Sequence, residues 1–365
     1  MALAVLAVIV VCCVFMGVHG NNEAFSRVFT EAKASNEFLQ YLDQGDHRTM
    51  VRQLRGDNGS TVLLLHNNPA TQTLWNPLFQ TMQRFSMAGA KIPNLVAYDI
   101  RGHGTAWMPV DPKYNDLDIN NYAWPGDLFV KDCKNVYDKI IGDGKIIIVG
   151  FGFGGYVAQK FALTYGDLIE KLVILQTTIT PNPEINTQIN YLGGPNGWIA
   201  RNPGISYLTM EERFVGDMLC SWFYLPHDKK CPEDRLIDEN DHGVNDSTSP
   251  QYNLAAMMWR QGSATTTLQT DKVNVADNLI SEWSKGGLEY PVHILAGTDD
   301  PSATPAMMTK TFTTIQHANR HLTVVLDVVN GRHGFTVMRP DYIAEIICGD
   351  CRKLVKRGTF TTTSL

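Results

Sequence analysis

The sequence has no run of basic residues, and its acidic side chains outnumber its basic ones. Of 365 residues, 31 are Lys or Arg and 37 are Asp or Glu, which gives a formal net charge of −6. Proteins that bind nucleic acids cluster Lys and Arg on one face or along one helix. We therefore expect no nucleic-acid partner. With 44% hydrophobic and 19% charged residues, the chain is typical of a globular protein.

Long apolar runs are also missing, except at the N-terminus. Residues 2–16 are apolar and uncharged, and Val18-His19-Gly20 follows with residues of the kind that a signal peptidase reads. The run is short for a membrane span, which needs about 20 residues. We predict a cleaved signal peptide over residues 1–20, with an uncleaved N-terminal anchor as the alternative. The expected location is extracellular or in the lumen of the secretory pathway, with no stable membrane span after cleavage.

Cysteine is scarce. The chain has seven, and five of them lie beyond the predicted signal: Cys133, Cys220, Cys231, Cys348 and Cys351. In an oxidising compartment some should pair, and an odd number leaves one thiol free or paired between chains. We predict a Cys220–Cys231 disulfide, because a short loop separates the two. Cys348 and Cys351 form a C-x-x-C motif. It is either a redox pair or, as we prefer without a thioredoxin-like strand before it, a source of one or two half-cystines for ordinary bridges.

Two glycosylation sequons fit the secretory prediction. Asn58-Gly59-Ser60 and Asn245-Asp246-Ser247 both have the N-x-S pattern. We therefore expect Asn58 and Asn245 to be glycosylated.

Buried strands alternate with helices through most of the chain. Continuous apolar stretches predict strands over residues 61–65, 94–98, 146–149, 171–175, 291–296 and 322–326, with two weaker strands within 37–55. Helices are predicted over residues 74–86, 120–141, 156–165 and 339–353. Such alternation indicates a mainly parallel sheet with helices on both faces.

One segment interrupts this rhythm. Residues 181–285 contain several short helical patterns and no strong strand. We predict a helical cap there, inserted between two parts of one α/β core, residues 21–180 and 286–365.

A reactive side chain is missing where one is most expected. Gly150-Phe151-Gly152-Phe153-Gly154 lies between a predicted strand and a predicted helix, which is the layout of the G-x-S-x-G nucleophile elbow. Gly152 stands at the central position, where Ser, Asp or Cys would be the nucleophile. Glycine adopts the strained turn of an elbow without a Cβ clash, so it suits an elbow that no longer needs a nucleophile.

Other polar loops follow the predicted strands: residues 66–69, 99–104, 297–301 and 331–335. Ligands of open parallel sheets bind outside the carboxyl ends of the strands, so these loops are expected to meet around one site. The elbow at residues 150–154 is followed by an acidic turn at residues 297–301 and then by His333. This is the chain order of the catalytic residues in α/β-hydrolases.

Taken together, these motifs make residues 37–355 resemble an α/β-hydrolase-fold protein. His66-x-Asn68-Pro69, followed by Trp75, resembles the H-G-x-P loop of haloalkane dehalogenases and epoxide hydrolases. Residues 99–104 resemble the D-x-R-G-x-G loop of the family, and Gly297-x-x-Asp300-Pro301 resembles its acid turn.

The resemblance implies a general base and an acid that orients it. His333 matches the histidine of the family and would transfer protons near neutral pH. Asp300 would orient and charge-stabilise His333, with Asp299 as the alternative acid.

It also implies an oxyanion hole made of backbone N–H groups. The donors would be the N–H groups of Asn68 and Phe153, and the Asn68 side chain could add its amide. Asn67 replaces the glycine of the family and would alter the geometry of this loop.

Three functions remain open. The first is a catalytically silent, secreted protein that binds a small apolar molecule or a protein partner, with Phe151, Phe153 and Trp107 lining a pocket unless they pack in the core. The second is a divergent hydrolase of esters, epoxides or haloalkanes, in which His333 and Asp300 activate water. The third is a lyase or oxygenase without a cofactor, with His333 as the base. No cofactor or metal is expected for any of them.

Overall fold

The computed structural model describes residues 36–68, 70–106, 126–179, 279–335, 339–349 and 351. All but two of these residues belong to the compact unit Phe38–Leu365. Several predictions fall outside the described residues: the signal peptide, the Cys220–Cys231 disulfide, Asn245, Pro69, Trp107 and the cap up to residue 278.

The described residues form an eight-stranded sheet with the order β1-β2-β4-β3-β5-β6-β7-β8. Strand β2 pairs antiparallel with β4. From β4 onward in the sheet order, which includes β3, neighbouring strands are parallel. The strands are β1 (Glu37–Asp43), β2 (Arg48–Leu54), β3 (Thr61–Leu65), β4 (Asn94–Tyr98), β5 (Ile146–Phe151), β6 (Ile169–Leu175), β7 (Val292–Gly297) and β8 (Val324–Val329).

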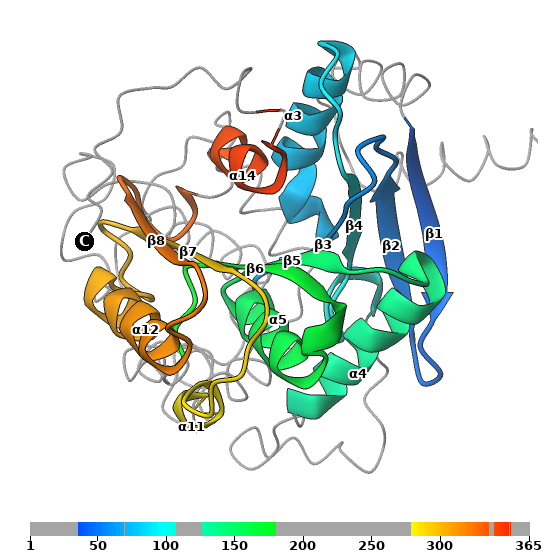
Figure 1. Cartoon of the computed structure of the whole chain (residues 1–365). Helices are drawn as coiled ribbons and strands as arrows, with labels where there is room; N and C mark the ends of the chain where they lie inside the picture. The colour runs from blue at the N-terminus through cyan, green and yellow to red at the C-terminus, as the bar shows by residue number, and fades with distance from the viewer. Residues whose placement is uncertain are drawn as a thin grey trace, which may run out of the picture. The chain divides into compact units, whose positions relative to one another are not determined.

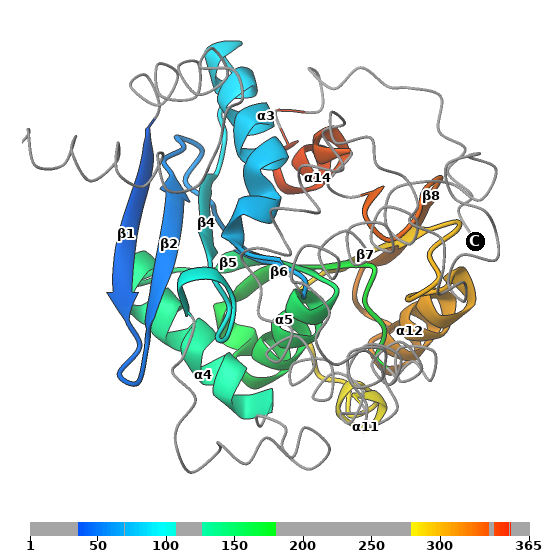
Figure 2. The ribbon, with the colours of Figure 1, turned by 180° about the vertical axis from the view of Figure 1, so that it is seen from behind.

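Helices cover both faces of the sheet (Figures 1 and 2). On one face lie α3 (Asn76–Met87) and α14 (Pro340–Ile347), and on the other lie α4 (Gly126–Val136), α5 (Phe153–Thr164), α11 (Ile280–Trp283) and α12 (Pro305–Ala318). Each face buries its own apolar cluster, because the parallel strands send alternate side chains to opposite sides. All six residues of β5 are buried, as expected for a strand covered on both faces.

Several predicted elements differ at their ends. Helix α5 begins at Phe153 rather than Tyr156, because Gly155 and Tyr156 already donate their N–H groups to the carbonyl of Gly152. Packing against the sheet overrides the weak helix propensity of its first glycines. Strand β8 begins at Val324 and ends at Val329, in register with β7 from Val292 to Gly297.

The C-x-x-C motif corrects a prediction. Helix α14 ends at Ile347 rather than near residue 353, since Cys348 has an extended backbone. Cys348 and Cys351 form a disulfide with each other, a pairing that the sequence analysis did not single out. The two lie in one turn, 5.3 Å apart at Cα, which is within reach of a direct bond. Among the described cysteines, Cys133 is free and buried, and burial raises the pKa of its thiol to about 12.

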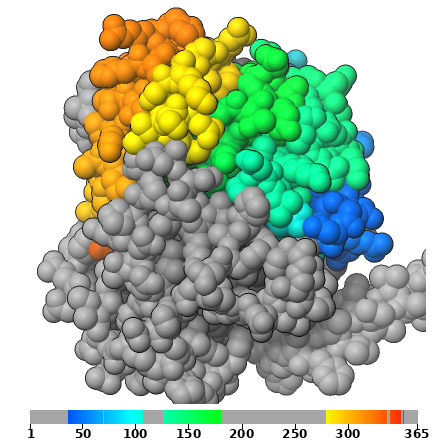
Figure 3. Space-filling view, turned by 90° about the horizontal axis from the view of Figure 1, so that it is seen from below, coloured from blue at the N-terminus to red at the C-terminus, as the bar shows by residue number. Residues whose placement is uncertain are grey.

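A hollow and an exposed asparagine lie on the surface. Viewed from below, the segment with α11 lies beside the segment with α5 (Figure 3). They line a hollow of about 290 Å³ near the amino-terminal ends of β6 and β7. Asn58 is exposed in the turn before β3. Within the described ranges, no helix has the length and apolarity that a membrane span requires.

Candidate active site

The turn between β5 and α5 places a bare backbone at the centre of the candidate site. Gly152 has φ 52° and ψ −118°, backbone angles that residues other than glycine rarely adopt. Helix α5 then passes very close to the end of β3: a Cβ on Gly154 would lie 2.3 Å from the carbonyl oxygen of Leu65. The glycines of this segment therefore serve two needs, a positive φ and a close approach of the helix to the sheet.

His333 and Asp300 come together at the carboxyl ends of β8 and β7. Nδ1 of His333 lies 2.9 Å from Oδ2 and 3.1 Å from Oδ1 of Asp300. The N–H groups of Ser302 and Ala303 also donate to Asp300 Oδ1, at 2.8 and 2.9 Å. Because Asp300 occupies Nδ1 with an acceptor, the proton of the neutral ring belongs there and Nε2 is left as an acceptor. Asp299 instead is exposed and accepts from Thr298, so Asp300 is the acid that contacts His333.

The loop that carries His333 is tied to β6. Nε2 of Gln176 donates to the carbonyl of Arg332 at 2.7 Å, next to the histidine. Gln176 directly follows β6 and has φ 49°, the one non-glycine residue with a positive φ in the described part of the chain. Strained backbone of this kind costs about 1–3 kcal/mol and tends to cluster at functional sites. Here it coincides with the hydrogen bond from the Gln176 amide to the histidine loop.

The side chain of Asn67 occupies the position of the predicted oxyanion hole. Its Oδ1 accepts from the N–H of Asn68 at 2.8 Å and from the N–H of Phe153 at 2.7 Å. Its Nδ2 lies 3.0 Å from Nε2 of His333. The two backbone donors require the oxygen on their side, and the Nε2 acceptor requires the amino group on the other. One buried amide therefore uses both predicted hole donors and the predicted base.

The strand register explains how Asn67 comes to lie beside Gly152. Leu65 pairs with Gly150 in the parallel β3–β5 ladder. Two residues beyond each partner, Asn67 follows β3 and Gly152 follows β5. A Cβ on Gly152 would lie 2.0 Å from Oδ1 and 2.2 Å from Cγ of Asn67. The Asn67 amide thus fills the space that a side chain at position 152 would need.

The side chain of Asn68 does not enter the hole. Its Oδ1 pairs with Nε2 of His103 at 2.8 Å, so only the backbone N–H of Asn68 takes the predicted place. His103 packs edge-on against His66, whose Nε2 accepts from the N–H of Ile100 at 2.8 Å. Both rings are completely buried. Burial lowers the pKa of His66 to about 4 and that of His103 to about 3, so both are neutral supports of the loop.

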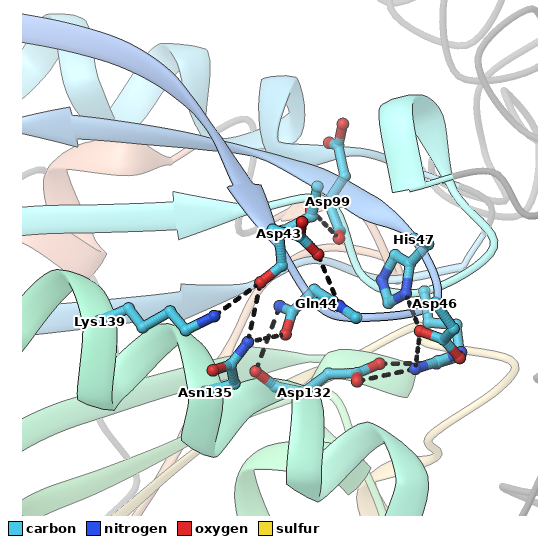
Figure 4. A network of polar contacts seen from close by, with 11 residues as sticks. Asp43, Gln44, Asp46, His47, Asp99, Asp132, Asn135 and Lys139 are labelled. Atoms are coloured by element: carbon cyan, nitrogen blue, oxygen red, sulfur yellow. Dashed lines mark hydrogen bonds and ion pairs between the residues drawn. The ribbon is translucent and has the colours of Figure 1, made fainter.

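A charge cluster around the buried Arg101 fixes the loop after β4. Arg101 makes a bidentate pair with Asp132, at 2.7 and 2.8 Å, and also binds Asp46 in the β1–β2 turn at 2.6 Å. Figure 4 shows the carboxylates of Asp46 and Asp132 in this cluster, with His47 beside Asp46. Burial alone would raise the pKa of Asp46, but its hydrogen bonds with Arg101 and His47 outweigh burial and lower it to about 2. These ion pairs hold the loop after β4 in place, so we assign the loop a structural role rather than a reactive one.

The aromatic residues near the site split into two roles. The ring of Phe151 lies 5.0 Å from that of His333, centre to centre, and is fully buried. The ring of Phe153 packs against Phe129 and Tyr156 in the core, so it offers the site only its backbone N–H. Within the described residues, no group of His, Cys, Asp and Glu could hold a metal ion.

The position of the Asn67 side chain could not be predicted from the sequence. The sequence shows only that Asn replaces a glycine in a loop that resembles the H-G-x-P motif. The pairing of Asn67 with Gly152 could have served as a signal, because the bulk gained at position 67 matches the bulk missing at position 152.

The comparisons with known proteins agree on the fold. Residues 62–346 match the model of the alpha/beta hydrolase family. Human epoxide hydrolase 4 is 26% identical over 135 residues, which are 36% of this chain and 32% of that protein. A zebrafish (Danio rerio) serine hydrolase-like protein is 28% identical over 151 residues, 40% of each chain. The chain thus spans about a third of the length of the first curated relatives it matches.

Solved structures extend the likeness over most of the chain. An esterase from Exiguobacterium antarcticum superposes with a TM-score of 0.61 at 14% identity, covering 86% of this chain and 100% of the other. The enol-lactonase of Burkholderia xenovorans LB400 gives 0.60 at 16% identity, with the same coverage. At these identities the structures speak for the fold alone. Because the family model matches residues 62–346, which are most of this chain, and the sheet is mainly parallel as described above, this chain belongs to the alpha/beta hydrolase family.

Proposed function

We propose that this protein is an α/β-hydrolase family member without covalent hydrolase activity, which binds a small, mostly apolar molecule at the former catalytic centre. One observation carries the proposal: the Asn67 amide accepts from the N–H groups of Asn68 and Phe153 and contacts Nε2 of His333. Gly152 offers no nucleophile beside it. In a serine hydrolase, loss of the nucleophile costs on the order of 10⁶ in kcat.

The hydrogen bonds of Asn67 make the site hard to open. A ligand that displaces the amide would leave two buried N–H groups and one ring nitrogen without partners unless it replaced them. Each unsatisfied buried group costs about 1–3 kcal/mol. The ligand therefore needs an acceptor for the two N–H groups and a donor for Nε2, on an otherwise apolar body that can contact Phe151.

The secretory location remains part of this proposal. A disulfide joins Cys348 and Cys351, which suits an oxidising compartment. The exposed position of Asn58 suits glycosylation. Expression in mammalian cells with and without residues 1–20 would test secretion, and loss of a glycan in Asn58→Gln would test the sequon.

A second candidate function rests on the intact His333–Asp300 pair. With Asn67 turned away, Nε2 could take a proton from a water molecule that attacks an ester, epoxide or haloalkane, or from the substrate itself, as in a lyase or an oxygenase. The pair is hydrogen-bonded at 2.9 Å, and human epoxide hydrolase 4 is among the relatives. Such activity is expected to be weak, since Asn67 must leave first.

A substrate screen separates the two candidates. Freshly purified protein would be assayed with p-nitrophenyl esters, epoxides and haloalkanes, alongside His333→Gln. The proposal expects the two proteins to show the same background. Turnover by the wild-type protein that disappears in His333→Gln would overturn it in favour of the second candidate. Asn67→Gly, which opens the hole, is the matched variant for binding and is expected to bind small carbonyl compounds more tightly than the wild type.

A further inference from the structure

Asn67 carries a side chain into the position of the missing nucleophile, but from a different strand. The amide follows β3, whereas Gly152 follows β5, and a Cβ on Gly152 would overlap Oδ1 and Cγ of Asn67. A carboxamide is not a nucleophile. A carboxylate in the same place would be one, since Asp and Glu carboxylates form covalent intermediates in several enzyme classes.

The surroundings of the amide are those of a bound amide substrate. Two N–H groups hold its oxygen at 2.8 and 2.7 Å, within the range that stabilises a developing oxyanion. Its nitrogen, the leaving group in hydrolysis, lies 3.0 Å from Nε2 of His333. Asp300 contacts Nδ1 on the other side of the ring. Asn67 as a whole residue is 6% exposed, so the residue is not completely enclosed by protein.

We propose that Asn67 is a latent nucleophile: the site hydrolyses its side-chain amide in place, and the aspartate formed at position 67 supplies a reactive carboxylate at the empty position. Water first replaces the Asn67 amino group as the hydrogen-bond partner of Nε2 of His333. It then adds to Cγ as Nε2 takes its proton, and the charge on oxygen is stabilised by the two N–H groups. The Cγ–N bond then breaks as His333 returns the proton to nitrogen, and ammonia leaves. The overall change is amide plus water to carboxylate plus ammonium.

The product would be placed for attack on a saturated carbon. One oxygen of the carboxylate keeps the two N–H donors, and the other takes the place of the amide nitrogen. With an alkyl bromide as probe, a carboxylate oxygen bonds to carbon, the carbon–bromine bond breaks, and bromide leaves with the electron pair. The ester formed would have its carbonyl oxygen in the same hole, ready for hydrolysis by water and His333. This inference uses the site of the proposed function but concerns a later, converted form of the protein.

The first experiment follows the conversion. Purified protein would be incubated in heavy-oxygen water, and the peptide that contains Asn67 and Asn68 analysed by tandem mass spectrometry. We expect position 67 to convert to aspartate with one heavy oxygen and no isoaspartate, at least tenfold faster than position 68. Ordinary deamidation proceeds through attack by the next backbone nitrogen and yields both isomers. Isoaspartate, equal rates at the two positions, or no conversion would overturn the proposal.

Two controls make the result specific. His333→Gln is expected to lose the fast conversion, and Asp300→Asn to slow it, with circular dichroism reporting whether each variant is folded. Wild-type protein unfolded in urea provides a control that needs no variant: conversion at position 67 should fall once the site is dismantled. Conversion that is unchanged in urea or in a folded His333→Gln would contradict the proposal.

The second experiment tests the nucleophile directly. Asn67→Asp, alone and with His333→Gln, would be treated with a primary alkyl bromide, with Asn67→Ala as the control. We expect bromide release by Asn67→Asp and a trapped ester on residue 67 in the double variant, where the base for ester hydrolysis is gone. Absence of both would overturn the nucleophile. Freshly prepared wild type should be inert under either outcome, so a failure here leaves the proposed binding function separately testable.

Discussion

Oδ1 of Asn67 lies 2.7 Å from the backbone nitrogen of Phe153, a residue 86 positions further along the chain. This hydrogen bond joins the loop after β3 to the first turn of α5. It places a side-chain carbonyl where α/β-hydrolases would stabilise a reaction intermediate. The same amide reaches Nε2 of His333 with its nitrogen, so it connects all parts of the candidate site.

Restoring a nucleophile at position 152 alone should fail. In Gly152→Ser the new Cβ would lie 2.0 Å from Asn67 Oδ1, and φ 52° adds strain of about 1–3 kcal/mol. We expect a lower melting temperature and no esterase activity above that of the wild type. Asn67→Gly/Gly152→Ser removes the collision and should hydrolyse p-nitrophenyl acetate at least 10²-fold faster than either single variant. Equal activity of Gly152→Ser and the double variant would show that Asn67 does not block the site.

Truncation of Asn67 should destabilise the fold. Asn67→Ala leaves the N–H groups of Asn68 and Phe153 without their acceptor at a buried site, which costs about 1–3 kcal/mol. Urea unfolding would measure the loss. Asn58→Ala, at an exposed turn, is the matched control and should change the free energy of unfolding by under about 0.5 kcal/mol. No difference between the two variants would mean that water replaces the amide without loss.

The stability of the fold should fall as the pH drops below the pKa of a free histidine. Burial lowers the pKa of His66 from 6.5 to about 4, so at intermediate pH the unfolded chain binds a proton that the folded chain does not. The contribution is fully present above pH 6.5 and is lost as the pH falls toward about 4. For His66 alone the loss is on the order of 3 kcal/mol, and His103 acts in the same direction.

Urea titrations at several pH values between 7 and 4 would measure this effect. His66→Gln, which keeps an acceptor for the N–H of Ile100, should make the pH dependence less steep, and the part that comes from His103 should remain. His317→Gln, at an exposed position near the end of α12, should leave it unchanged. A pH dependence as steep in His66→Gln as in the wild type would show that His66 does not contribute to it.

The two carboxylates around Arg101 should differ in importance. The Asp132 side chain is 5% exposed and that of Asp46 is 49% exposed, although both pair with Arg101. Asp132→Asn weakens a buried bidentate pair and should destabilise the protein strongly, by about 3–5 kcal/mol. Asp46→Asn should cost about 1 kcal/mol or less, because water already screens that pair. Thermal unfolding of both variants would check the order, and equal losses would contradict it.

The patterns of apolar residues largely fixed the architecture. The strands over residues 61–65 and 94–98 have the predicted bounds, because continuous apolar runs between polar loops have few other solutions in a parallel sheet. The polar loops that follow these strands meet at one edge of the sheet, because parallel strands all end there. Helix ends were less predictable: α14 stops where the Cys348–Cys351 bridge begins, and pairing of cysteines is not encoded in their spacing alone.

The sequence by itself determined the α/β fold, the bare backbone at Gly152 and the presence of His333 and Asp300 in the order of the family. Only the tertiary structure decided what fills the space at Gly152. The β3–β5 register brings Asn67 level with Gly152, and the direction of its side chain depends on two N–H groups and a histidine from distant parts of the chain. A buried amide turns toward whichever partners satisfy it, and those partners exist only once the sheet has formed.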